Sequence, residues 1–171
     1  MRAPLCALLA CALAGASGLG APARAQAWHR LDSAASARPQ VAALQVTDET
    51  GQPFGQNPFA QQARARFGRV EYRVVTAAYL RRRARIDLVL PPTVAGLLRP
   101  QGLVFEWRGL DGAQDGRLTP GQRQPLWTGV ITQAVTPLAI ELEMRLDLGA
   151  LGPWNGGHFG VEPGFELVLL P

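Results

Sequence analysis

The sequence predicts an all-β protein, an antiparallel immunoglobulin-like β-sandwich with about six to eight strands. Three observations support this fold class. One long stretch alternates large apolar residues with charged ones, several shorter stretches share its period, and turn-forming Gly, Pro, Asn and Asp residues separate them. Alternation with period two puts one set of side chains on each face of a strand, so one face is buried and the other meets water.

The strongest strand pattern covers residues 137–148. Its six large apolar residues occupy the even positions from Leu138 to Leu148, with charged residues between them. The residue types would tolerate a helix, but a helix would scatter the apolar positions around its circumference. We therefore predict a long, half-buried strand. Glu141 and Glu143 then share its solvated face with Arg145 instead of forming a catalytic carboxylate pair.

Shorter alternating stretches predict the other strands, in chain order at residues 41–47, 69–76, 85–90, 103–108, 125–132 and 164–170. Residues 48–62 are polar and contain Gly51, Pro53, Gly55 and Pro58, which predicts a loop. Residues 93–98 are compatible with a short helical turn.

Residues 1–25 have the pattern of a secretory signal peptide: a positive start, an apolar run and small residues before a cleavage site after Ala25. We expect export to the periplasm or cell surface. The only cysteines, Cys6 and Cys11, lie in this segment, and too short an apolar run precedes Cys11 for a lipoprotein signal. Residues 26–39 are expected to form a flexible leader, anchored by Trp28 or Leu31, before one β-sandwich domain at residues 40–171.

Charge excludes one class of partner. The chain has no lysine, and its 17 arginines against 13 acidic residues become a net +2 once Arg2 and Arg24 are removed. Nucleic-acid binding would need a far larger basic excess, and no second long apolar run predicts a membrane span. Residues 64–85 hold eight arginines and one acid, whereas acids outnumber arginines from Ile86 onward. This split suggests a charge-guided head-to-tail contact between copies.

Catalytic residue types are scarce, so we predict no catalytic site, no metal site and no cofactor. Beyond residue 25 the sequence has two histidines, His29 and His158, and two serines, Ser33 and Ser36, both in the predicted leader. These residues do not form a nucleophile–base pair or a metal-ligand spacing. Residues 111–116 resemble a calcium loop only faintly and are better explained by two Asp-Gly turns.

Three groups of residues are candidates for binding. Arg81, Arg82, Arg83 and Arg85 lie between two predicted strands, either as a contact for an anionic partner or as a charged hairpin tip. Trp107, Trp127 and Trp154 either stack on sugars or pack in the core. The apolar final strand, with Phe165, Leu167 and Leu169, is either a central core strand or a strand-pairing edge for another polypeptide.

The order of the segments at residues 69–76, 86–92 and 103–107, followed by a Gly-aromatic-Gly step at Gly157–Gly160 and the final apolar strand, resembles fimbrial subunits. The closest kinds are the alternate chaperone–usher pilins and the related spore-coat-U-like secreted pilins. The resemblance covers residues 69–171. It implies an immunoglobulin-like sandwich completed in trans, first by a periplasmic chaperone and then by the N-terminal segment of a neighbouring subunit. It implies no active-site residues.

Together these observations predict a non-enzymatic, exported protein with a structural or adhesive role at the cell envelope, acting through protein partners or self-assembly. A fimbrial subunit is the most specific form of this expectation. The alternative is a periplasmic module that binds a glycan or a lipid headgroup through the tryptophans and the arginine group.

Overall fold

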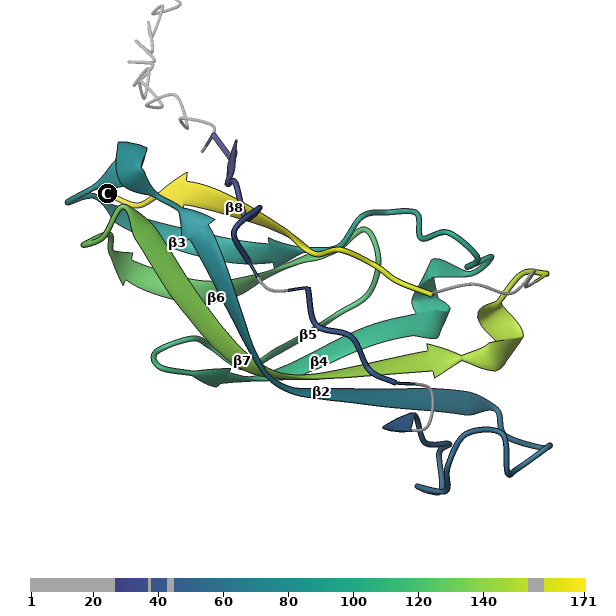
Figure 1. The fold of residues 1–171 in the computed structure, drawn as a ribbon. Coiled ribbons are helices and arrows are strands. Elements are labelled where there is room, and N and C mark those ends of the chain that lie inside the picture. The colour runs from purple at the N-terminus through teal and green to yellow at the C-terminus, as the bar shows by residue number, and fades with distance from the viewer. Residues whose placement is uncertain (1–26, 37, 43–44, 154–158) are drawn as a thin grey trace, which may run out of the picture.

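Two four-stranded antiparallel sheets pack face to face in the computed structural model, which describes residues 27–36, 38–42, 45–153 and 159–171 (Figure 1). The first sheet has the strand order β1-β8-β3-β6 and the second has the order β2-β7-β4-β5. The strands are β1 His29–Arg30, β2 Gln62–Val75, β3 Arg83–Val89, β4 Leu103–Leu110, β5 Gly116–Leu118, β6 Arg123–Val130, β7 Val135–Asp147 and β8 Gly164–Leu169. The predicted fold class, an all-β antiparallel sandwich, is confirmed.

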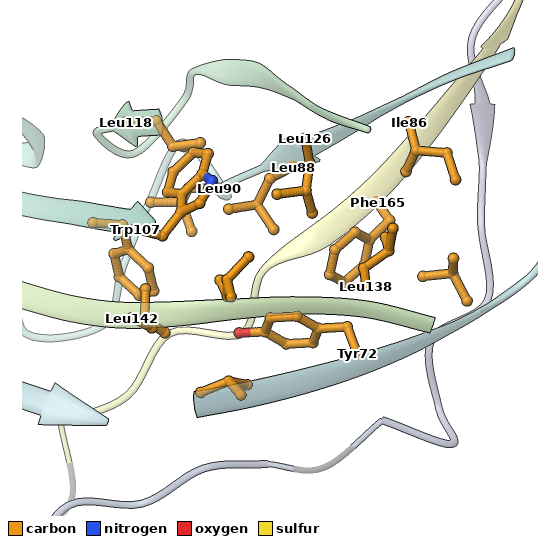
Figure 2. Packing of buried hydrophobic residues seen from close by; sticks show 14 of the residues in the cluster. Tyr72, Ile86, Leu88, Leu90, Trp107, Leu118, Leu126, Leu138, Leu142 and Phe165 are labelled. Atoms are coloured by element: carbon orange, nitrogen blue, oxygen red, sulfur yellow. The ribbon is translucent and has the colours of Figure 1, made fainter. Parts of the chain in front are cut away.

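The core lies between the two sheets because alternate residues of every long strand point inward. Tyr72 from β2 stacks at a tilt on Phe165 from β8, with ring centroids 5.0 Å apart. Figure 2 shows these two rings among aliphatic side chains from both sheets. Burial raises the pKa of Tyr72 to about 12, as expected for a phenol enclosed by apolar neighbours.

Strand β7 matches the predicted strand closely, and β2 is longer than predicted. Strand β2 begins at Gln62, so it includes alternating Ala and Arg residues that precede the predicted start at Arg69. A bulge between Arg66 and Gly68 interrupts its pairing with β7, and Gly68 has a φ of 65° there. Such a conformation favours glycine. Residues 93–98 form a turn closed by a Leu97 N–H bond to the Val94 carbonyl instead of a helix.

The predicted strand at residues 41–47 is wrong. Leu44 lies outside the described residues, and in the described part of this stretch only Thr47 pairs, through isolated bridges to Pro53 and Arg64. The reason lies in the next residue, Asp48, whose buried carboxylate captures nearby donors. Its Oδ1 accepts bonds from the Thr50 N–H, the Thr50 hydroxyl and the Gln52 N–H at 2.7–2.9 Å. These local bonds turn the backbone directly after Thr47, so its pairing with Arg64 does not extend into a ladder.

Asp48 also holds the far side of the loop, because the Asn57 side-chain amide donates to its Oδ2 at 2.9 Å. The bonds from Asn57, Thr50 and Gln52 all favour the ionised carboxylate and lower the pKa of Asp48 to about 2. The segment at residues 48–57 is therefore a loop, as predicted, but one built around a single carboxylate.

Both described core-side tryptophans pack on glycines. A Cβ on Gly116 of β5 would overlap the Trp107 ring of β4, and a Cβ on Gly129 of β6 would press on the Trp127 ring. The Trp107 indole N–H donates to the Gln114 carbonyl at 2.8 Å, which fixes the ring over β5. The lack of a side chain at these glycines therefore makes room for the rings.

We expect Gly116→Ala to destabilise the folded chain by about 1–3 kcal/mol, because the new methyl group forces the Trp107 ring out of its packed position. Urea unfolding and the near-UV circular dichroism of the tryptophans measure the effect. Gly160→Ala is the matched control, since a Cβ there meets no atom within 4 Å. Equal unfolding midpoints for the two variants would contradict this packing.

Asp48 predicts a definite pH dependence. Its pKa is lowered in the folded chain, so its stabilising contribution is complete above the ordinary value of 3.8 and is lost as pH falls toward about 2. We expect Asp48→Asn to have a lower Tm than the native chain near neutral pH and a smaller further loss of Tm in that acid range. Thermal melting across the range measures both. Asp111→Asn, at an exposed carboxylate, is the control and keeps the native slope.

Candidate functional site: the β8 edge and the arginine tip

Strand β8 has two unequal neighbours. On one side β3 pairs with all six residues from Gly164 to Leu169. On the other side β1 pairs only with Glu166 and Leu167, and the Leu31 N–H adds one bond to the Phe165 carbonyl at 2.9 Å. We call this second side the β8 edge. On this side Gly164, Val168 and Leu169 have no strand partner in the described part of the chain.

The predicted edge residues Phe165, Leu167 and Leu169 face inward. Phe165 and Leu167 are fully buried, and Leu169 is half-buried against the same core. Each of the two interpretations of the final strand therefore holds for one part of it, the side chains or the backbone. Its side chains belong to the core, as in a central strand, while its outer backbone is an incompletely covered edge.

Residues 28–36, here called the crossing segment, connect the two sheets on this side of the sandwich. Figure 1 shows the segment running from beside β8 toward β2. After β1, Leu31 enters the core with only 6% of its surface exposed. The Asp32 carbonyl then accepts a bond from the Val75 N–H of β2 at 2.8 Å. The Ser36 hydroxyl exchanges two bonds with the backbone of Arg73 at 2.9 and 3.2 Å.

The predicted leader therefore contributes a strand and a core residue, and both of its proposed anchors are engaged. Trp28 lies beneath two guanidinium groups, with the Cζ atoms of Arg85 and Arg123 at 5.1 and 4.4 Å from its ring centroid. Contacts of this kind stabilise the ring by cation–π attraction. The start of the segment is thus held on the outer face of the first sheet by side chains.

The two arginines over Trp28 are themselves held by carboxylates. Arg85 Nε donates to Asp87 Oδ1 at 2.8 Å, and Arg123 lies 2.9 Å from Glu166. Asp87 is only 1% exposed, and this burial raises its pKa, opposed by the bond from Arg85. Sequence reasoning missed this group because Trp28, Arg85, Arg123 and Glu166 come from four separate segments.

The predicted arginine group divides in two. Arg85 is occupied by Asp87 and Trp28, whereas Arg81 and Arg82 are exposed at the turn before β3 and Arg83 is exposed as its first residue. Backbone bonds between Arg81, Arg82 and Ile131 hold this turn on the end of β6. We call the exposed surface of Leu80, Arg81, Arg82, Arg83 and the facing Val130 the arginine tip. Within the described residues, none of its three arginines forms an ion pair.

The charge split along the sequence does not survive folding. Strand β2 from the basic part lies beside β7 from the acidic part, with Arg66 opposite Glu143 and Arg69 opposite Glu141. Arg66 lies 3.1 Å from Glu143, and Arg108 of β4 lies 2.8 Å from Glu141. The two charge types neutralise each other on one sheet face. The predicted charge-guided contact between copies therefore loses the observation on which it was based.

The remaining candidates give no clustered chemistry. Trp107 is buried in the core, while Trp127 is half-buried and lines a hollow of about 160 Å³ beside Val130 and Gln133. Trp154 and His158 lie outside the described residues. Among the described residues no group of three or more metal-ligating side chains gathers, and no helix is long and apolar enough to span a bilayer. Asp111 pairs with Arg69 while Asp115 accepts a bond from the Gly109 N–H, so the two do not form one calcium loop.

Comparison of the chain with protein-family models, with curated proteins and with solved structures found no match in any of the three. The candidate site therefore has to be judged on its own geometry.

The burial of Leu31 predicts that the crossing segment stabilises the fold. We expect Leu31→Ala to lower the free energy of unfolding by about 2–4 kcal/mol, because it removes a core side chain and loosens β1. Leu98→Ala, at a leucine that is 70% exposed, is the matched control and should change stability by less than about 0.5 kcal/mol. Equal denaturation midpoints would mean that the segment does not dock as described.

Proposed function

We propose that this chain is a structural subunit of a cell-envelope assembly, exported to the periplasm or cell surface, and that the β8 edge is where it joins its neighbour. One observation carries the proposal. Strand β8 is paired along its whole length by β3 but along only two residues by β1. An edge of this kind offers unpaired N–H and C=O groups to a strand from another polypeptide.

The crossing segment is the natural candidate for the joining strand. It belongs to the part of the chain that precedes the long strands, and few backbone bonds hold it, chiefly at Leu31 and Asp32. If the segment of a second copy took its place on β8, the same contacts would form between copies. Exchange of an identical element costs little free energy because the bonds lost are regained.

The resemblance to fimbrial subunits is consistent with this arrangement. In those proteins an N-terminal segment of a neighbour completes the sandwich, after a chaperone has protected it. Here the segment closes its own sandwich in the single chain, so assembly would begin by its release from β8. A periplasmic chaperone that pairs with β8 in the interval is part of the proposal.

A structural role also suits the chemistry of the described residues. The buried hydroxyl groups of Thr76 and Thr136 form a hydrogen bond with each other at 2.8 Å, so both hold the fold together. The carboxylates on the outer faces are largely matched by arginines. The proposal therefore assigns the chain no catalytic activity.

A reversible cross-link across β1 and β8 tests the proposal. Arg30 lies opposite Glu166, and the neighbouring Leu31–Phe165 bond makes this the closer, non-hydrogen-bonded kind of pair, which suits a disulfide. We expect the chain from Gln26 onward to form concentration-dependent oligomers in light scattering. The oxidised Arg30→Cys/Glu166→Cys variant should stay monomeric, because its segment cannot leave.

The same variant in its reduced state is the matched control and should assemble again. Native chain that remains monomeric at every concentration would contradict self-assembly. An oxidised variant that assembles as readily as the reduced one would contradict the exchange of this segment.

A further inference from the structure

We propose that the arginine tip binds anionic lipid headgroups at a bilayer surface. The arginine tip shares no residue with the β8 edge. It would bind through charged and apolar side chains, whereas the β8 edge would bind through backbone pairing. The arginine tip contains three consecutive arginines that have no carboxylate partner among the described residues.

Charge is the first argument. Most arginines on the strands face a carboxylate, as Arg66, Arg69, Arg85, Arg108, Arg117, Arg123 and Arg145 do. Arg81, Arg82 and Arg83 are consecutive, exposed and without such a partner in the described part of the chain. Three adjacent guanidinium groups form a local positive charge on a molecule in which most of the other strand arginines are paired with carboxylates. Their fork geometry suits phosphate oxygens.

The apolar residues beside these arginines favour a bilayer over a soluble polyanion. Leu80 precedes the arginines and is 44% exposed, and Val130, opposite Arg83 in the β3–β6 pairing, is 53% exposed. A sugar or phosphate polymer would gain nothing from exposed aliphatic side chains. At a membrane surface the guanidinium groups would reach the phosphates while Leu80 and Val130 enter the headgroup layer.

The backbone supplies an independent argument. Arg81 has a φ of 62°, a left-handed conformation that suits glycine and strains a long side chain. Its N–H bonds to the Ile131 carbonyl at 2.8 Å, so the turn holds that conformation. An arginine in a conformation better suited to glycine fits a side chain that serves a purpose outside the fold.

The place of the arginine tip in the fold also fits binding to a bilayer. The turn lies at the end of the sandwich where β3 begins, next to the last residues of β8 (Figure 1). The crossing segment meets β8 further along, at Glu166 and Leu167. A chain bound to a bilayer through this end would leave both outer sheet faces free.

Vesicle co-sedimentation tests the proposal with the chain from Gln26 onward. We expect binding to phosphatidylglycerol–phosphatidylethanolamine vesicles, weakened by added salt, and no binding to phosphatidylcholine vesicles. Each basic residue near an anionic bilayer raises partitioning about five-fold, so Arg82→Ala/Arg83→Ala should weaken binding about 25-fold. Arg30→Ala/Arg73→Ala removes the same charge from two other exposed arginines and should weaken it far less.

Two more variants test whether a loss of vesicle binding comes from misfolding or from a loss of charge alone. Arg81→Gly should weaken binding to the anionic vesicles about five-fold while its Tm stays equal to or above the native value, because the strain is relieved. Leu80→Ser/Val130→Ser should weaken vesicle binding but leave retention on heparin unchanged.

Three results would overturn the proposal: no binding to anionic vesicles, equal loss in the tip and control double variants, or heparin binding as strong as vesicle binding with no effect of the serine variants. The last result would identify a site for soluble polyanions. None of these results bears on the β8 edge, which the disulfide experiment tests separately.

Discussion

The pairing of β2 with β7 is the constraint on which the rest of the structure depends. It runs from Gln62 opposite Asp147 to Val75 opposite Val135. It aligns apolar side chains on the inner face of the sheet and opposite charges on the outer face. Inward, Tyr72 meets Leu138 in the core, and outward, Arg66 meets Glu143. A slip of one residue would turn the apolar set to water and bury the charges, so only one register satisfies both faces.

This register also determines which surfaces remain for partners. Because it places the basic early strand against the acidic late strand, most charges of the second sheet are used within the chain. Surface ion pairs of this kind contribute little stability each, but they remove net charge from the sheet face. Among the surfaces that remain are the arginine tip at the start of β3, where three consecutive arginines lack carboxylate partners in the described chain, and the outer backbone of β8.

The fold could be predicted from the sequence wherever large apolar residues alternate with charges, as they do in β7. Strand β5 escaped prediction because it has only three residues, and β1 escaped because two residues cannot show a period. The charged clusters were harder still. Arg85 looked equivalent to Arg81–Arg83 along the chain, yet as a strand residue it lies beside Asp87 and under Trp28. Only the three-dimensional register distinguishes a held arginine from a free one.

The way in which the sandwich is closed connects the fold with the proposed assembly. The crossing segment is held mainly by side chains, with Leu31 in the core and Trp28 beneath two arginines, and only β1 adds a short ladder. Its backbone bonds to β8 are few and lie at β1 and at the Leu31 N–H, so side-chain anchors carry much of its attachment. The same segment arriving from a second copy would form these same anchors and the same short ladder. Exchange between copies would therefore change the contacts little, and a high protein concentration would favour it over closure within one chain.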